Sequence, residues 1–133
     1  MVEICADINT LDKIILHLKK HNSSKIFLLQ GDLASGKTTL VQAYTKSIYP
    51  NELVTSPTFN LIHQYKDIYH YDFYQRPLEE LLNLGLLEWF ENNGVHFVEW
   101  GDKKLEILLK ENGYNVCIIE LIKQDNHRIY RIF

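Results

Sequence analysis

The sequence predicts an α/β fold in three layers, in which helices cover both faces of a mixed sheet. The sheet is expected to be mainly parallel in its centre, with antiparallel edge strands. Residues 26–29 (IFLL) form a continuous apolar run, which is typical of a strand buried on both faces of a parallel sheet. A glycine-containing turn and a helical pattern follow that run at once. Strand and helix patterns then alternate to the end of the chain, as they do in α/β sandwiches.

A single domain is expected over residues 1–133. A chain of 133 residues is too short for two separate cores, and its 46% of apolar residues is typical of a globular protein.

The first third of the chain supplies two strand–helix pairs. Residues 2–5 suit a short edge strand, and Asn9 or Thr10 can cap a helix over residues 10–21 whose apolar side chains share one face. The buried run described above comes next, and it leads into a helix over residues 37–47.

The middle of the chain predicts a hairpin, a helical region and a further strand. Residues 59–65 and 68–73 are extended runs, and the two residues between them are enough for a tight turn. Pro77, with two glutamates behind it, suits the first turn of a helical region. The strand at 95–99 follows a glycine.

The C-terminal part predicts a helix and a closing strand pair. The helix over residues 103–110 ends at Asn112-Gly113, because glycine favours the backbone conformation that terminates helices. Residues 114–122 and 128–133 are then expected to pair in antiparallel fashion around a short polar turn.

The charge balance restricts the partners. With 14 basic and 17 acidic residues the formal net charge is −3. Non-specific binding to a phosphate backbone needs a surplus of basic side chains, so the chain is not expected to hold nucleic acid by itself. Any nucleic acid would be held by a partner.

The cysteines and the apolar runs predict a compartment. Cys5 and Cys117 fit no zinc or redox spacing and lie in apolar runs, so both are expected to be buried, reduced thiols. No stretch approaches the roughly 20 apolar residues of a membrane span, and residues 1–7 lack the pattern of a signal peptide. We therefore expect a cytoplasmic protein with no membrane partner.

Residues 31–38 (GDLASGKT) match the phosphate-loop pattern G-x-x-x-x-G-K-[ST], which makes the predicted sandwich a P-loop NTPase fold. Gly31 and Gly36 allow a tight turn whose N–H groups, with the following helix N-terminus, attract phosphates. Lys37 adds a charge over the β- and γ-phosphates, and the Thr38 hydroxyl ligates Mg²⁺. Lys37 is expected to face solvent when the loop is empty. The predicted nucleotide contacts are Gly31, Asp32, Leu33, Ala34, Ser35, Gly36, Lys37, Thr38 and Thr39.

Two acids are candidates for the rest of the metal site. Asp72 and Glu99 each end a strand pattern, and open α/β sheets bind ligands at the C-terminal ends of their strands. We expect Lys37, Asp72 and Glu99 to act in catalysis, and Thr38, Asp72 and Glu99 to hold Mg²⁺. If the two carboxylates share one site, they repel each other without metal, so neutralising either would maintain or raise stability. Trp100, next to Glu99, is expected either to pack as a large apolar residue or to form a wall of the nucleotide cleft.

In their order along the chain, several motifs resemble the TsaE (YjeE) ATPases, which serve the biosynthesis of threonylcarbamoyladenosine in bacterial tRNA. The resemblance covers nearly the whole chain. It rests on residues 31–39 (GDLASGKTT), 55–59 (TSPTF), 69–74 (YHYDFY), 84–86 (LGL) and 98–100 (VEW).

The resemblance implies an ATP- and Mg²⁺-dependent subunit that joins TsaB and TsaD and meets tRNA only through them. It also implies roles for single residues. Thr38 and Glu99 would ligate Mg²⁺, and Asp72 would act as the Walker B-like acid. Ser56, Pro57 and Thr58 would form a switch-like loop near the γ-phosphate. The segment around residues 6–9 and the C-terminal strands would lie near the adenine.

Two positions depart from the family pattern. This chain has Ala34 where the family usually has glycine, so the loop must tolerate a Cβ there. The family usually has arginine directly after the tyrosine of its Asp-x-Tyr motif, whereas here Gln75 follows Tyr74 and the arginine is Arg76. We therefore assign no site role to this arginine.

Three classes of function fit the sequence: the ATPase subunit, a small P-loop kinase, and a nucleotide-sensing interaction module without useful turnover. Such kinases close an arginine-bearing lid over the phosphates, whereas this chain has only Arg76, Arg128 and Arg131 and no obvious lid insertion. A GTPase is disfavoured because the Asn-Lys-x-Asp base-reading motif is missing.

Overall fold

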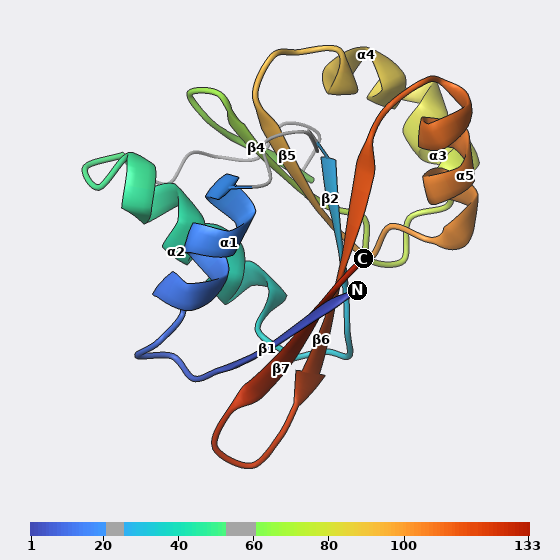
Figure 1. The fold of residues 1–133 in the computed structure, drawn as a ribbon. Coiled ribbons are helices and arrows are strands. Elements are labelled where there is room, and N and C mark those ends of the chain that lie inside the picture. The colour runs from blue at the N-terminus through green and yellow to red at the C-terminus, as the bar shows by residue number, and fades with distance from the viewer. Residues whose placement is uncertain (21–25, 53–60) are drawn as a thin grey trace.

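The structure, a computed structural model, describes residues 1–20, 26–52 and 61–133. Seven strands and five helices are described, and the elements occur in the predicted order (Figure 1). They are β1 (Val2–Ala6), α1 (Asp12–Lys20), β2 (Ile26–Gln30), α2 (Lys37–Ile48), β3 (Ile62–Tyr65), β4 (Ile68–Asp72), α3 (Leu78–Asn83), α4 (Leu86–Phe90), β5 (Val95–Glu99), α5 (Lys103–Glu111), β6 (Val116–Lys123) and β7 (Arg128–Ile132).

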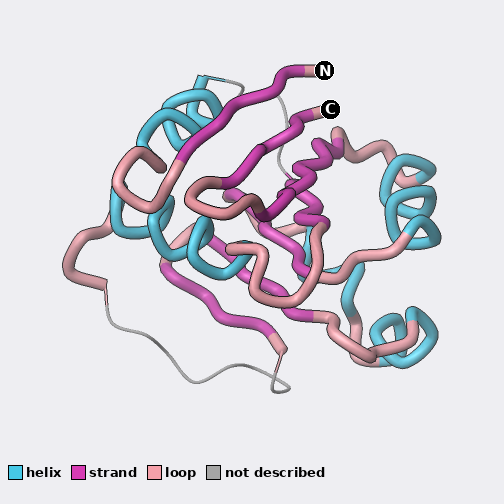
Figure 2. Tube along the Cα trace, turned by 90° about the horizontal axis from the view of Figure 1, so that it is seen from below, coloured by secondary structure: helices cyan, strands magenta, loops and turns pink. Residues whose placement is uncertain are grey.

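The described strands form one sheet in the order β1-β7-β6-β2-β5-β4-β3. The four central strands, β6, β2, β5 and β4, pair in parallel. The outer pairs, β1 with β7, β7 with β6 and β3 with β4, are antiparallel. The first and last strands lie side by side, so the two termini are neighbours (Figure 2). The predicted mixed α/β fold is confirmed.

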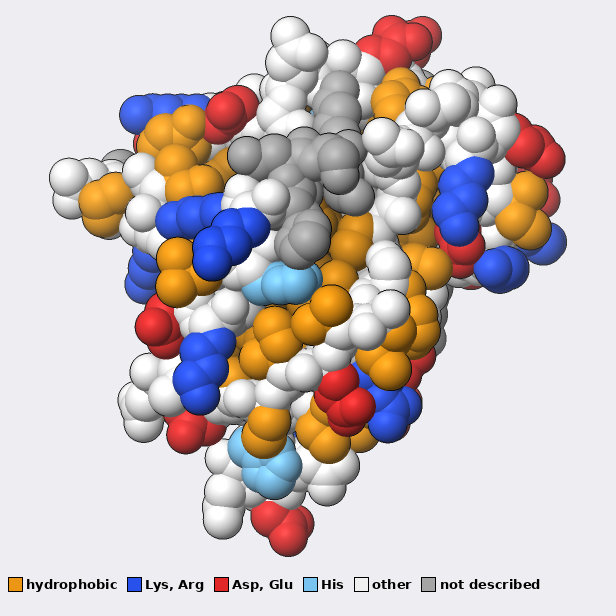
Figure 3. Space-filling view, in the orientation of Figure 1, with side chains coloured by type: hydrophobic (Ala, Val, Ile, Leu, Met, Phe, Trp, Pro, Cys, Tyr) orange, Lys and Arg blue, Asp and Glu red, His pale blue; other side chains and the backbone are white. Residues whose placement is uncertain are grey.

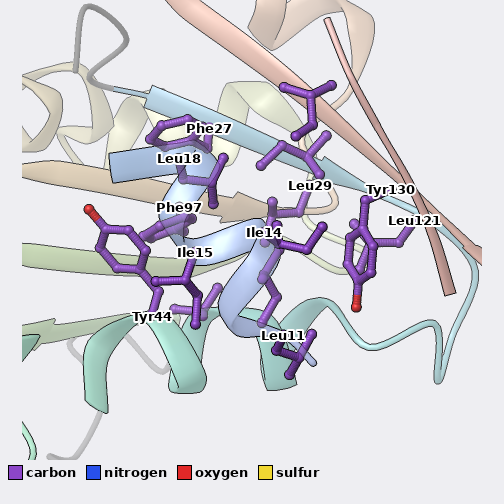
Figure 4. Packing of buried hydrophobic residues seen from close by; sticks show 14 of the residues in the cluster. Leu11, Ile14, Ile15, Leu18, Phe27, Leu29, Tyr44, Phe97, Leu121 and Tyr130 are labelled. Carbon is purple, nitrogen blue, oxygen red and sulfur yellow. The ribbon is translucent and has the colours of Figure 1, made fainter. Parts of the chain in front are cut away.

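Helices cover both faces of this sheet, with α1 and α2 on one side and α3, α4 and α5 on the other (Figure 1). Alternate side chains of β2 supply both cores, because successive residues of a strand point to opposite faces. Phe27 and Leu29 pack with residues of α1 and α2 (Figure 4). Ile26 and Leu28 pack with residues of α3, α4 and α5. The apolar run at 26–29 is therefore the strand buried on both faces that its composition predicts.

One local expectation is confirmed in more detail and another needs correction. The predicted helical region after Pro77 is present as two short helices, because Gly85 takes a positive φ of 82° between α3 and α4. The cysteines are both free thiols, but only Cys117 is buried, so the prediction of a buried thiol is wrong for Cys5. The apolar residues around Cys5 belong to an edge strand, and an edge strand is less completely covered than a central one.

The surface agrees with the modest net charge. Among the described residues on the face shown in Figure 3, acidic and basic side chains are interspersed and form no continuous basic surface. Within the described ranges, no helix has both the length and the apolar character to cross a membrane.

Candidate functional site

The phosphate loop connects the C-terminal end of β2 to the first turn of α2. Gly31 has no room for a side chain, since a Cβ there would lie 2.6 Å from Ser35 Oγ and 2.7 Å from the carbonyl oxygen of Leu121. Gly36 has a φ of 102°, which L side chains rarely adopt. Both motif glycines are thus needed by the backbone that turns β2 into α2.

Ala34 also has a positive φ, of 61°. This left-handed conformation costs a residue with a Cβ roughly 1–2 kcal/mol, which explains why glycine suits the position better. The loop thus holds a residue with a Cβ at a position whose backbone favours glycine.

A cavity of about 450 Å³ lies against the loop. It collects most of the predicted nucleotide, metal and catalytic residues, together with Trp100. Its lining residues are Leu33, Ala34, Ser35, Gly36, Lys37, Thr38, Thr39, Asp72, Tyr74, Glu99, Trp100 and Arg128. The two remaining loop residues, Gly31 and Asp32, line a separate cavity on the β6 side of the loop.

Lys37 is folded back onto the loop. Its Nζ donates hydrogen bonds to the carbonyl oxygens of Gly31 at 2.5 Å and Asp32 at 3.2 Å. The residue is only 5% exposed, so the expectation that it faces solvent is wrong. The physical reason is that a buried ammonium group needs hydrogen-bond acceptors, and the loop carbonyls supply them. Burial lowers the pKa of Lys37, although the charges of Glu99, Asp32 and Asp72 oppose that shift.

Trp100 forms a wall of the cavity. The Lys37 Nζ lies 3.9 Å from the centroid of its ring, within the range of a cation–π contact. The Tyr74 ring lies 4.9 Å from the Trp100 ring. Trp100 has a φ of 63°, an uncommon backbone conformation for a large side chain. Of the two placements predicted for Trp100, the structure has the one beside the cleft.

Glu99 is the centre of a buried polar network. Its Oε2 accepts a hydrogen bond from Thr38 Oγ1 at 2.7 Å and lies 2.5 Å from His70 Nε2. Glu99 is 4% exposed. Burial by itself raises the pKa of Glu99, but the hydrogen bonds from His70 and Thr38 and the charge of Lys37 together lower it below its ordinary value.

Asp72 stands beside this network. It pairs in register with Glu99 across β4 and β5, and it is exposed at the end of its strand. Its Oδ1 accepts a hydrogen bond from the backbone N–H of Tyr74 at 3.1 Å. The two strand-end acids therefore lie next to each other at the loop, where the sequence places them.

The oxygen atoms gathered here fit Mg²⁺ better than a softer metal. A hydroxyl and carboxylates are the ligand types that Mg²⁺ prefers, and Mg²⁺ keeps several water or phosphate ligands in nucleotide sites. Among the described residues, no group of three or more His, Cys, Asp or Glu side chains could hold a metal ion by itself. Thr38, Glu99 and Asp72 are thus the oxygen-bearing side chains that would hold the ion, with phosphate or water oxygens as further ligands.

Three side chains belong to the site although the sequence did not assign them to it. His70 contacts Glu99, and Tyr74 and Arg128 line the cavity. His70 lies two residues before Asp72 on one strand, so the period of β-strands already places both on the same face. Arg128 donates from Nε to the Ser35 carbonyl at 2.9 Å across 93 residues of sequence, and no local pattern signals such a contact.

The other predicted residues lie away from the cavity or outside the described ranges. Arg76 forms an ion pair with Glu80 and is not among the residues that line the cavity. Ser56, Pro57 and Thr58, the predicted switch-like loop, lie outside the described residues.

Comparisons with known proteins show the family of the chain. The family model "Threonylcarbamoyl adenosine biosynthesis protein TsaE" matches residues 5–130. The chain is similar to three proteins named tRNA threonylcarbamoyladenosine biosynthesis protein TsaE. That of Haemophilus influenzae is 35% identical over 122 residues, which are 82% of this chain and 77% of the relative. That of Bacillus subtilis is 36% identical over 66% of this chain and 63% of the relative. That of Nostoc is 36% identical over 71% of this chain and 64% of the relative.

The match thus spans slightly less than two thirds of the Bacillus and Nostoc proteins. Among solved structures, the crystal structure of Bacillus subtilis YdiB has a similar fold. Its TM-score is 0.56 at 20% identity, and the match covers 97% of this chain and 82% of that one. The phosphate loop, the ordered motifs and the family match lead to one conclusion: the chain belongs to the TsaE family of threonylcarbamoyladenosine biosynthesis proteins.

Proposed function

We propose that this chain is a Mg²⁺-dependent ATP-binding and ATP-hydrolysing subunit that supports TsaB and TsaD in forming threonylcarbamoyladenosine in tRNA. One observation carries the proposal. Lys37 and Thr38 stand in the first turn of α2 and Glu99 ends β5, and the three side chains meet at one cavity beside the phosphate loop. This arrangement of side chains binds and polarises a nucleoside triphosphate in P-loop enzymes.

Different residues of the site would bind the phosphates and the metal ion. The loop N–H groups and the N-terminus of α2 would bind the phosphates. Lys37 would exchange its bonds to Gly31 and Asp32 for the β- and γ-phosphate oxygens. Thr38, Glu99 and Asp72 would hold Mg²⁺. The ion would neutralise the charge that develops on the phosphoryl group.

The partners follow from the family and from the charge. The relatives are named for tRNA threonylcarbamoyladenosine biosynthesis, and the net charge of −3 disfavours direct binding of tRNA by this chain. We infer that TsaB and TsaD hold the tRNA and that this chain acts on them in the cytoplasm.

The arginines favour this function over a small P-loop kinase. The sequence has three arginines. Arg76 pairs with Glu80, and Arg131 lies 3.5 Å from a carboxylate oxygen of Glu120. Arg128, which reaches the cavity, is hydrogen-bonded to the loop itself. None of the three stands on a lid that would offset the charge of a transferred phosphoryl group.

Reconstitution with TsaB and TsaD tests the function. We expect ATP with Mg²⁺ to stabilise a complex of the three proteins, and we expect hydrolysis to rise above that of the isolated chain. Complex formation that depends on ATP without any hydrolysis would make the chain a nucleotide-sensing module. Binding of neither ATP nor the partners would refute the proposal.

A further inference from the structure

We propose that His70 is a positioning residue for the nucleotide–metal site: its ring Nε2–H holds the Glu99 carboxylate in the orientation in which it meets Thr38. This inference rests on the proposed function, because it requires that Glu99 and Thr38 serve a bound nucleotide and its metal.

The pleat of β4 brings His70 to Glu99. Alternate residues of a strand share a face, so His70 and Asp72 lie on the same side as Ile68, which packs in the core beneath α1 and α2. In the parallel pairing of β4 with β5, Asp72 lies opposite Glu99, and His70 lies opposite Phe97. His70 is therefore one pleat behind the two acids, on the face that carries α2.

The contact is short, buried and shared. His70 Nε2 lies 2.5 Å from Glu99 Oε2, the same oxygen that accepts the Thr38 hydroxyl at 2.7 Å. His70 is 6% exposed. An ionised carboxylate only accepts hydrogen bonds, so the imidazole must donate from Nε2. One oxygen is thus held from two elements, α2 and β4, and this fixes the direction of the carboxylate.

The two donors are not equivalent. Thr38 is itself a predicted Mg²⁺ ligand, so its hydroxyl has a second task at the site. His70 is not among the residues that line the nucleotide cavity. It borders instead a smaller cavity of about 160 Å³, lined also by Val41, Thr45 and Tyr65. His70 therefore acts through Glu99 and not on the nucleotide, as the outer partners of metal ligands do.

A second buried histidine offers a matched control. His96 lies on β5 with its Nδ1 2.6 Å from the Tyr71 hydroxyl oxygen and its Nε2 2.9 Å from the Asn92 carbonyl oxygen. Its ring stacks on that of Tyr69 at 4.6 Å. His96 is 0% exposed, against 6% for His70, and neither histidine is among the residues lining the nucleotide cavity.

The experiment compares His70→Gln, His70→Asn and His96→Gln. The glutamine amide carries its N–H at about the reach of imidazole Nε2, whereas the asparagine amide reaches only as far as Nδ1. Calorimetry would measure the affinity for a non-hydrolysable ATP analogue with and without Mg²⁺, and thermal unfolding would monitor the nucleotide-free fold. In the wild type, Mg²⁺ should raise the affinity for the analogue, and this increase is the Mg²⁺ gain. We expect the Mg²⁺ gain to be about tenfold smaller in His70→Asn, and we expect the affinity measured without Mg²⁺ to be unchanged. His70→Gln should keep most of that gain. His96→Gln should have a lower melting temperature than the wild type and should keep the full Mg²⁺ gain.

An unchanged Mg²⁺ gain in His70→Asn would overturn the inference. An equal loss in both His70 variants would also overturn it, because packing of the ring and not the Nε2 donor would then be responsible. If His70→Asn does not fold, the test rests on His70→Gln. A Mg²⁺ gain that is retained in His70→Gln supports the inference, and a Mg²⁺ gain that is lost refutes it. If Mg²⁺ does not raise the affinity of the wild type, the proposed function is refuted and this inference with it. If Mg²⁺ raises the affinity of the wild type but the variants behave otherwise than expected, only this inference fails.

Discussion

The ammonium nitrogen of Lys37 lies 3.9 Å from the centroid of the Trp100 ring while it also bonds two carbonyl oxygens of its own loop. The cation is thus held on one side by the indole and on the other by the backbone. Any phosphate that Lys37 binds must compete with both contacts, so nucleotide binding is coupled to a change in the surroundings of Trp100.

Nucleotide binding should therefore change the fluorescence of Trp100. Displacing a cation from an indole face alters the electrostatic surroundings of that ring. We expect the change on adding ATP and Mg²⁺ to disappear in Trp100→Phe. The matched control is Trp89→Phe, because the other tryptophan of the chain packs against the Tyr69 ring in the opposite core. A signal that survives in Trp100→Phe and is lost in Trp89→Phe would contradict this coupling.

Lys37→Ala should abolish productive ATP binding or turnover and also destabilise the empty protein moderately. The variant loses the charge over the phosphates together with two hydrogen bonds and the contact with Trp100. We expect a loss of about 1–2 kcal/mol in the free energy of unfolding. Urea unfolding and ATP titration would measure both, with the exposed Lys104→Ala as the control. Wild-type turnover in folded Lys37→Ala would refute the phosphate-loop assignment.

Adenine nucleotides should bind more tightly than guanine nucleotides. The Asn-Lys-x-Asp motif that reads guanine is missing from the sequence, and the TsaE family points to ATP. Calorimetric titration with each nucleotide in the presence of Mg²⁺ measures the preference. Tighter binding of GTP would reverse the assignment of the base.

Glu99→Gln should destabilise the protein, which is the opposite of what repulsion between Asp72 and Glu99 predicts. Burial raises the pKa of Glu99, but the bonds from His70 and Thr38 and the charge of Lys37 lower it below 4.5. A carboxyl whose pKa is lowered by folding contributes its full stability above the unfolded value, and the contribution vanishes as the pH falls through the folded value. At pH 7 we expect the free energy of unfolding of Glu99→Gln to be about 1–2 kcal/mol below that of the wild type. This difference should disappear in acid, as the pH falls below 4.5.

Glu106→Gln is the control for that variant. Its carboxylate is buried and accepts hydrogen bonds from Lys110 at 2.8 Å and Lys103 at 3.1 Å, and the bond from Lys110 is the main reason that its pKa is also lowered. The stability of Glu106→Gln relative to the wild type should change with pH in the same direction as that of Glu99→Gln. Its Mg²⁺-dependent hydrolysis should be unchanged. If Glu99→Gln melts early yet hydrolyses ATP normally, Glu99 is structural, and Asp72 alone remains as the acid of the metal site.

Asp72→Asn should separate function from stability. The side chain is exposed and its one described hydrogen bond comes from the Tyr74 backbone, so we expect a stability change within about 0.5 kcal/mol. Mg²⁺-dependent hydrolysis should nevertheless fall, although less than in Glu99→Gln. A melting temperature several degrees lower, with hydrolysis intact, would show that Asp72 serves the strand end and not the metal.

Several parts of the fold could be predicted because their signals are local. The apolar run of β2 and the alternating or helical periods of the other elements predict where strands and helices lie. The division of the helical region into α3 and α4 at Gly85 cannot be predicted in this way, since a helical period continues on both sides of it. The exposure of Cys5 cannot be predicted either, because composition does not distinguish an edge strand from a covered one.

The sequence alone determined the phosphate loop, because eight consecutive residues carry its backbone requirements and its chemistry. Only the tertiary structure decided the hydrogen bond of Thr38 with Glu99 across 61 residues and the contact of Arg128 with Ser35 across 93. Such contacts depend on the order in which β6, β2, β5 and β4 pair, and on which face of each strand the helices cover. The folding back of Lys37 onto its own loop has the same origin: the surrounding elements bury its ammonium group, and a buried charge must find acceptors nearby.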